Sequence, residues 1–247
     1  MRFVLLFFFL EYFLIGFGQT NSKLEIPQFG KKDTIVVHTG YSVSYNSIFR
    51  QANWVAYQLT AFETIKVVDR KDKFKADPKI LKTDNAKDYL KSGYDRGHLA
   101  PSADMTFSEI TMLESFYFSN ISPQNPSFNR GIWNKLEDQT RSWAKLYDSI
   151  YIVVGPILED SLSTIGIHQI PVPKRYYKVI LDNHKNHEKM IAFIIENKES
   201  KLTLQKFVVT VDSVETITGI DFFPLLVDSL ETKLESEFHA EYWKWDN

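Results

Sequence analysis

The sequence predicts a single α+β domain, and three observations support this fold class. Short apolar or alternating segments typical of β-strands lie before and after two segments with helical periodicity. The 247 residues are 44% hydrophobic and 15% aromatic, so the chain can bury a sizeable core and is not of a disordered class. It contains no internal repeat, no low-complexity linker and no break in composition, which favours one domain over two.

The N-terminus has the composition of a secretory signal peptide spanning residues 1–18. Arg2 precedes an apolar run, and Gly16 and Gly18 supply the small residues expected before a cleavage site. An N-terminal membrane anchor is the alternative interpretation. However, an apolar run of about fifteen residues that contains Glu11 is short for crossing a bilayer. We therefore expect export, to a secreted or periplasmic location.

Cleavage of the signal would leave a polar leader, 19–33, in front of a folded domain that spans 34–247. The leader contains Pro27 and Gly30 and no apolar run, so we expect it to be mobile. No later segment of the sequence is apolar enough to cross a membrane. We therefore expect no stable membrane association once the signal is removed.

The first part of the domain is expected to contain three strands. Residues 34–38 form a short β-branched run, 41–45 alternate as a half-buried strand does, and 54–59 continue the β character. A basic segment follows, in which Asp77-Pro78 indicates a turn.

Two segments have the spacing of amphipathic helices. In 108–118, Ser108 is placed as the cap, and the apolar positions are Ile110, Leu113, Phe116 and Tyr117. In 131–147, one stripe is formed by Trp133, Leu136, Thr140, Trp143 and Tyr147.

The remainder of the chain is expected to add four strands and one short helix. The strands are expected at 149–156, 176–181, 190–195 and 207–211. Asp212 is placed to cap a helix that ends near Gly219. At the C-terminus, Trp243 and Trp245 could stack on nucleic-acid bases or anchor the tail on the domain, and we expect anchoring.

Charge is unevenly distributed, although the formal net charge is only −2. Between Lys66 and Arg96, ten basic residues stand against six acids, which leaves +4; from Val227 onward, six acids stand against two lysines, which leaves −4. The basic segment can attract a polyanion locally, but either charged run can also be ordinary solvated surface. The absence of cysteine excludes disulfides, thiolate metal sites and a cysteine nucleophile.

Three polar strings supply residue types suited to phosphodiester hydrolysis. Residues 94–101 read YDRGHLAP, 119–124 read SNISPQ and 128–138 read FNRGIWNKLED. A histidine titrates near neutral pH, so His98 can serve as a general base. Arg96 can donate two hydrogen bonds to a phosphate. The amide oxygen of Asn129 and the carboxylate of Glu137 suit Mg²⁺, which prefers oxygen ligands.

Each of these residues also has an ordinary structural interpretation. A histidine beside a glycine is often structural, Asn129 could cap the following helix, and Glu137 could be an exposed helix acid. Arg96 could pair with Asp95 or Asp104. The functional interpretation therefore depends on the spacing of the three strings together.

Taken together, the strings resemble the DNA/RNA non-specific endonuclease family, which includes secreted bacterial nucleases and mitochondrial endonuclease G. Further segments that resemble the family lie at 41–45, 53–57, 153–156 and 218–224. The resemblance spans roughly 34–226. It implies a ββα-metal (His-Me finger) fold, in which a mostly antiparallel central sheet is flanked by helices.

The resemblance also implies roles for the site residues. His98 would be the general base, and Arg96 would neutralise the scissile phosphate. Asn129 would be the sole direct protein ligand of one Mg²⁺ (Mn²⁺ being possible), and Glu137 would act on the metal through water. Asn120 would lie beside the metal and its waters, as a fourth catalytic residue.

Substrate binding is assigned to Arg70, Arg96 and Arg130, of which Arg70 stands near the position where the family has an upstream phosphate-binding arginine. The partners implied are DNA and RNA, held through the phosphate backbone and cut to leave 5′-phosphate ends. Two alternatives remain: a catalytically degenerate nucleic-acid-binding module, and a phosphodiesterase for nucleotides or other small diesters. The sequence does not indicate an oligomeric state.

Overall fold

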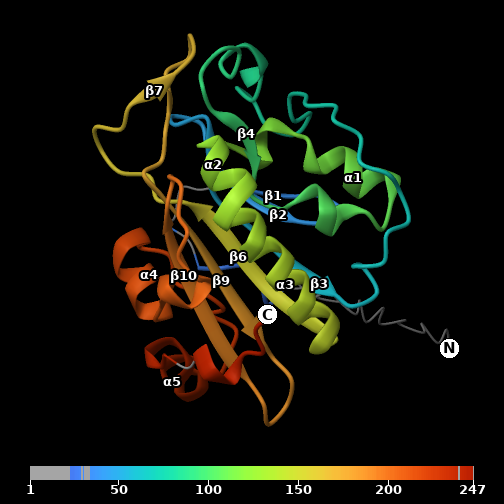
Figure 1. Cartoon of the computed structure of the whole chain (residues 1–247), viewed down its shortest axis with the longest axis vertical. Helices are drawn as coiled ribbons and strands as arrows, with labels where there is room; N and C mark the ends of the chain where they lie inside the picture. The colour runs from blue at the N-terminus through green and yellow to red at the C-terminus, as the bar shows by residue number, and fades with distance from the viewer. Residues whose placement is uncertain (1–22, 29, 31–33, 239, 247) are drawn as a thin grey trace, which may run out of the picture.

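A seven-stranded antiparallel sheet forms the centre of the computed structural model, which describes residues 23–28, 30, 34–238 and 240–246 (Figure 1). The strand order is β1-β2-β3-β6-β9-β10-β11, and helices cover both faces of the sheet. The expected α+β class with a mainly antiparallel sheet is confirmed. The predicted signal peptide lies outside the described residues. Within the described part of the chain, no helix combines the length and the apolar character needed to span a bilayer.

The elements have the following bounds. The central sheet consists of β1 (Ile35–Val37), β2 (Ser42–Asn46), β3 (Gln51–Thr60), β6 (Ser149–Pro156), β9 (Arg175–Asp182), β10 (Lys189–Glu196) and β11 (Val208–Val209). Two further ribbons pair β4 (Asp95–His98) with β5 (Ile121–Gln124) and β7 (Thr164–Ile165) with β8 (Ile170–Pro171). The α-helices are α1 (Glu109–Ser115), α2 (Pro126–Phe128), α3 (Asn134–Leu146), α4 (Val211–Thr218) and α5 (Asp228–Ser236).

The two apolar faces of the sheet explain why its inner strands read as continuous hydrophobic runs. Along β9, Tyr176 and Ile180 face the cluster that includes α3, whereas Tyr177 and Val179 face the cluster that includes α4 and α5. Successive side chains of a strand point to opposite faces, so a strand covered on both sides has no polar face. Lys178 is the exception. Because side chains alternate along the strand, it points to the same face as Tyr176 and Ile180, which is the α3 face.

Most predicted strands coincide with observed ones, and two differ. β3 begins at Gln51 rather than at 54 because Gln51, although polar, is buried and donates its side-chain amide to the Pro171 carbonyl, 2.9 Å away. β11 has only two residues because α4 begins at Val211. The hydroxyl of Thr210 accepts from the Ser213 amide, so Thr210 is the cap and the expectation of Asp212 was wrong.

The helix predicted over 108–118 forms, but with a different buried face. Ser108 caps it as expected, accepting from the Thr111 amide at 3.1 Å. Ile110 and Leu113 of the expected stripe are 59% and 42% exposed, whereas Met112 is fully buried. The helix has only seven residues, which is too short for apolar spacing alone to identify the buried side.

Both ends of the described chain are attached to the domain. In the expected leader, Leu24 and Ile26 pack against the α4–α5 side of the sheet, and the Gln28 amide donates to the Asp221 carbonyl at 2.8 Å. At the other end, the ring of Trp243 lies 4.6 Å from that of Trp143 between centroids and is 2% exposed. The tail is therefore anchored on α3, as the sequence predicted.

Candidate active site

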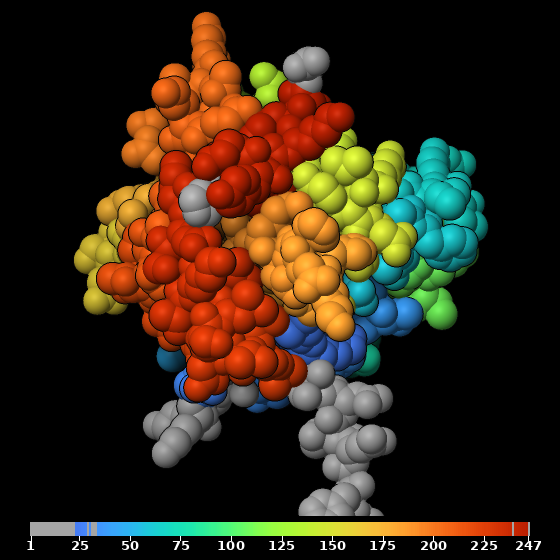
Figure 2. Space-filling model, turned by 90° about the horizontal axis from the view of Figure 1, so that it is seen from below, coloured from blue at the N-terminus to red at the C-terminus, as the bar shows by residue number. Residues whose placement is uncertain are grey.

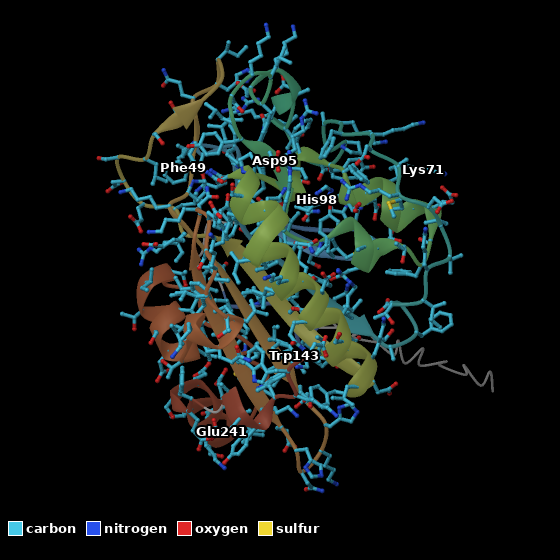
Figure 3. The ribbon with its side chains drawn as sticks, viewed as in Figure 1. Phe49, Lys71, Asp95, His98, Trp143 and Glu241 are labelled. Carbon is cyan, nitrogen blue, oxygen red and sulfur yellow. The ribbon has the colours of Figure 1, made fainter. Side chains whose placement is uncertain are left out.

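Two of the three polar strings, 94–101 and 128–138, line one cavity of about 520 Å³, whereas no residue of 119–124 does so. β4 and β5 form an antiparallel ribbon, and α3 follows them, which gives the expected ββα unit. Asp95 and His98, both on β4, lie close together beyond one end of α3 (Figure 3). Six of the seven predicted site residues line the cavity, namely Arg70, Arg96, His98, Asn129, Arg130 and Glu137.

The glycine before His98 is required by the close approach of the two strands. Gly97 lies opposite Ser122 in the ribbon, and a Cβ at Gly97 would lie 2.1 Å from the side chain of Gln124. A larger residue would fit there only if the buried side chain of Gln124 moved. The DRGH string therefore forms a strand that turns His98 and Arg96 toward the same region as α3.

His98 is held among aromatic rings and is neutral at pH 7. Its ring centroid lies 5.6 Å from Phe74 and 4.9 Å from Phe116. Burial, and then the charge of Arg70, lowers the pKa of His98 from 6.5 to about 3. Within the described residues, Nε2 of His98 has no hydrogen-bond partner. Although Nε2 is buried, the residue lines the cavity, and a neutral imidazole can take a proton from a water there at its unprotonated nitrogen.

Asn129 is oriented by the carboxylate of Asp95. Its Nδ2 donates to Asp95 Oδ2 at 2.9 Å, so Oδ1, on the other branch of the planar amide, is turned away from that carboxylate. In the described part of the chain, Oδ1 accepts no hydrogen bond, and Asn129 lines the cavity. A neutral oxygen with free lone pairs suits a hard cation. Asn129 lies in a π-helical turn, Asn129–Trp133, and does not cap α3.

Glu137, in the first turn of α3, is half-buried and has an unusual charge environment. Burial, together with the charge of Asp104, raises the pKa of Glu137 from 4.5 to about 7 against the opposing charges of Lys178 and Arg141. Lys178 is fully buried on β9, where its ammonium lies 5.2 Å from the centroid of Trp133. Burial lowers the pKa of Lys178. The acid is therefore less readily ionised than a surface glutamate.

Two arginines present their guanidinium groups at the cavity. Arg70 donates from Nη1 to Ser102 Oγ at 2.9 Å, and Arg96 lies over the ring of Phe74 at 5.1 Å. Among the described residues, Arg96 forms no ion pair, so the pairing with Asp95 or Asp104 that the sequence left open does not occur. Both groups remain able to contact a phosphate.

Whereas Arg70 pairs with Asp72 at 2.8 Å, Arg130 is engaged with Asp95. It donates to Asp95 through Nε at 2.8 Å and through Nη2 at 2.6 Å. Asp95 therefore accepts from both Asn129 and Arg130. A phosphate would have to compete with that carboxylate, so this geometry favours a positioning role for Arg130 over the predicted substrate contact.

Asn120 does not line the cavity, which disagrees with a catalytic role. Its side chain is fully buried, and its oxygen accepts from the Ala100 amide at 2.9 Å. Its nitrogen donates to the carbonyls of Ala100 and Ser115 at 2.8 and 2.9 Å. Because its amide bonds to the backbone, Asn120 braces the segment after His98, and its predicted place beside the metal stays a prediction.

Sequence reasoning missed three residues that shape the site: Asp95, Arg141 and Lys178. Asp95 belongs to the DRGH string but was considered only as a partner for Arg96. Arg141 lies four residues after Glu137 on the same helix and pairs with Asp104 at 2.7 Å. Lys178 interrupts the apolar run of β9. A charged residue in a strand that is buried on both faces is unusual, and it could have marked Lys178 as a candidate site residue.

Comparisons with known proteins agree with this arrangement. The family model of the DNA/RNA non-specific endonucleases matches residues 18–229. Among relatives, mitochondrial nuclease EXOG of Danio rerio is 35% identical over 81% of this chain and 63% of its own length. Nuclease C1 of Cunninghamella echinulata is 35% identical over 81% of this chain and 88% of its own. The chain thus spans less than two thirds of the EXOG length but most of the fungal nuclease.

The fold is also shared with a solved structure. The chain resembles a protein in the crystal structure of the EndoG/EndoGI complex with a TM-score of 0.75 and 34% identity, over 81% of this chain and 89% of that one. Mitochondrial endonuclease G of Homo sapiens is 32% identical over 74% of this chain and 67% of its own length. The similarity confirms the predicted ββα-metal fold.

Proposed function

The chain belongs to the DNA/RNA non-specific endonuclease family, and from this premise we propose that it is a metal-dependent endonuclease that hydrolyses DNA and RNA. The observation that carries the proposal is the shared cavity: a neutral imidazole, His98, an unbonded amide oxygen, Asn129, and the acid Glu137 face it. Arg70 and Arg96 line the same space.

Substrate is held through its phosphates. The cavity offers two guanidinium groups, Arg70 and Arg96, each of which can form paired hydrogen bonds with phosphoryl oxygens. Contacts of this kind do not read base sequence, and they weaken as salt rises. We therefore expect little sequence preference and a strong dependence of binding on ionic strength.

His98 removes the proton from the attacking water. Its low pKa keeps the imidazole neutral at pH 7, and the negative phosphate brought by the substrate would raise that pKa toward the working range. General-base catalysis of this type contributes about 10²- to 10⁴-fold. Phe74 and Phe116 hold the ring in place, so the proton acceptor is positioned before substrate binds.

The residues present fit one hard divalent cation, Mg²⁺ or, as an alternative, Mn²⁺. Asn129 would supply the direct oxygen ligand, and Glu137 would act through water. When bound, such an ion supplies charge stabilisation at the phosphoryl and leaving oxygens. Asp95 keeps the amide of Asn129 turned so that its oxygen, rather than its nitrogen, is available. The products are expected to carry 5′-phosphate ends.

We further propose that residues 1–18 direct export and are removed, leaving the endonuclease domain. The apolar run of the N-terminus supports this, and the family match begins at residue 18. Several relatives are mitochondrial by name, so a mitochondrial address is the competing outcome. Mass spectrometry of the N-terminus of the native protein, recovered from medium, periplasm or cells, distinguishes a chain that starts near Gln19 from an uncleaved one.

A plasmid-nicking assay on the purified mature protein tests the activity. We expect nicking of DNA and cleavage of RNA in Mg²⁺, and none in EDTA. His98→Ala should lose at least about 10²-fold in rate while retaining DNA affinity measured by fluorescence anisotropy in EDTA. His184→Ala, in the β9–β10 turn, is the matched control. Nicking by His98→Ala at the wild-type rate would refute the base assignment.

The same assay separates the alternatives. A binding module would retain DNA in anisotropy without nicking it in any divalent cation. A small-diester phosphodiesterase would hydrolyse a chromogenic diester without inhibition by long DNA. We expect neither result, because two guanidinium groups stand beside the predicted base in an accessible cavity.

A further inference from the structure

A second group of carboxylates lies far from the cavity, between α4 and α5. Asp212 and Glu215 come from α4, Glu231 and Glu235 from α5, and Asp221 from the segment between the helices. The two helices lie beside each other on the opposite side of the sheet from α3 (Figure 1). Seen from below, the C-terminal segment that contains α5 forms part of the molecular surface (Figure 2).

The carboxylates converge in two sets that share Glu235. In one set, the ligand oxygens of Asp212, Glu215 and Glu235 lie within 4.8 Å of one another; in the other, those of Asp221, Glu231 and Glu235 do so. Calcium–oxygen distances are about 2.3 to 2.6 Å, so oxygens separated by up to roughly 5 Å can contact one ion. Both sets are therefore compact enough to hold a cation.

The burial of Glu235 and its unpartnered oxygen are an observation independent of this clustering. Glu235 is only 8% exposed, and its Oε1 has no hydrogen-bond partner among the described residues. Oε1 of Glu231, which belongs to the same set, is likewise buried without a partner. A buried carboxylate oxygen normally accepts at least one hydrogen bond. Here the unsatisfied oxygens come from the helix whose acids face the carboxylates of α4.

No basic residue offsets this concentration of charge in the described part of the chain. Among the described residues, none of the five acids forms an ion pair with Lys, Arg or His. Glu215 accepts from the Phe222 amide at 2.8 Å, and Glu215 and Glu235 are within hydrogen-bond reach of each other. The neighbouring acids therefore repel one another unless protons or a cation neutralise them.

We propose that Asp212, Glu215, Asp221, Glu231 and Glu235 form a binding site for Ca²⁺ that joins α4 to α5. The donor set consists of carboxylate oxygens without histidine or cysteine, which suits a hard cation and disfavours zinc. Ca²⁺ accepts six to eight oxygens in flexible geometry, whereas Mg²⁺ demands a regular octahedron and keeps its waters. The ion stabilises the C-terminal helices and takes no part in phosphodiester cleavage.

Thermal unfolding of the mature protein, first treated with chelator and then titrated with CaCl₂, tests the site. At a hundredfold excess over Kd, the melting temperature should rise by roughly 5 to 10 °C for a chain of this size. Glu235→Gln should lose most of this rise, whereas Glu199→Gln, an exposed acid outside the cluster, should keep it. Equal ionic strength in NaCl serves as the salt control.

Two further variants separate this site from the cavity. Asn129→Ala should respond to Ca²⁺ as the wild type does, and Glu235→Gln should still nick plasmid in Mg²⁺. Glu231→Gln repeats the test from a second ligand in case Glu235→Gln folds poorly. The proposal is overturned if Ca²⁺ does not change the melting temperature, or if it raises that of Glu235→Gln and Glu231→Gln as much as that of the wild type. Either result indicates that shared protons neutralise the cluster.

Discussion

Asp95 and Asn129 are joined by a hydrogen bond of 2.9 Å between Oδ2 and Nδ2, although 34 positions separate them in the chain. The bond connects β4 to the π-helical turn before α3, and so connects the strand of His98 to the predicted metal ligand. Arg130 holds the same carboxylate, donating from Nε to the same Oδ2 and from Nη2 to Oδ1. The orientation of the Asn129 amide therefore depends on a residue that would contact neither metal nor substrate.

Asp95→Asn should weaken metal use without removing a ligand. An asparagine cannot hold Arg130 as an ion pair and can present its own amide hydrogens to Asn129, so the Asn129 oxygen loses its fixed direction. Loss of such a supporting contact typically costs about 10- to 100-fold in metal affinity or activity. A Mg²⁺ titration of the nicking rate measures this loss. The control is Asp84→Asn, which breaks the ion pair between Asp84 and Arg50. An unchanged Mg²⁺ midpoint would contradict the positioning role.

Asn120→Ala and Asn129→Ala should fail in different ways. Asn120 bonds three backbone groups in the interior, and each buried group left unsatisfied costs about 1 to 3 kcal/mol. We expect Asn120→Ala to melt at a lower temperature with an unaltered Mg²⁺ midpoint. Asn129→Ala should keep its stability and require far more Mg²⁺. If Asn120→Ala shifted the metal dependence without loss of stability, Asn120 would act at the metal after all.

Lys178→Met should make the protein more stable and less active at acidic pH. Methionine fills a similar volume without a buried, unpaired ammonium. Lys178 lowers the pKa of Glu137, so its loss raises that pKa. If ionised Glu137 is required, activity falls as pH falls through its pKa, and the acidic limb of the pH–rate profile should move to higher pH. Lys206→Met, at an exposed position, should leave both the limb and the stability unchanged.

The metal-free protein should become less stable as pH rises from about 5 to about 8. Burial, followed by the charges of Glu215 and Glu231, raises the pKa of Glu235 from 4.5 to about 8. Between those values the folded state binds more protons than the unfolded chain, so stability is lost as the pH increases. Melting temperatures measured in EDTA should decline across this range in the wild type and less in Glu235→Gln. Identical slopes would show that Glu235 does not titrate there.

The regular elements were predictable where burial repeats along the chain. β9 and β10 are covered on both faces, so their apolar runs mark strands within one or two residues of the observed ends. The apolar stripe predicted for α3 is observed, because Trp133, Leu136 and Trp143 all pack in the same hydrophobic cluster of the core. Short elements gave weaker signals: α1 buries a face that its apolar spacing does not indicate.

Several elements escaped prediction, and two of them, β4 and α5, show that an element can owe its stability to distant partners. β4 reads as a polar string with a glycine, and it is a strand only because β5 pairs with it; Asp95, for example, lies opposite Gln124, 29 positions further along the chain. α5 is dominated by acids, and its two leucines, Leu230 and Leu234, become an apolar face only against the α4 side of the sheet.

The sequence by itself determined which chemical groups this protein brings to its site, because the DRGH string and the helix after Asn129 carry side chains whose types and order suffice to identify a nuclease. Only the tertiary structure decided what each group contacts there. It buried the amide of Asn120 in backbone hydrogen bonds, engaged Arg130 with Asp95, and left the oxygen of Asn129 unbonded. Hydrogen-bond partners depend on distance and direction in space, and spacing along the chain does not contain either.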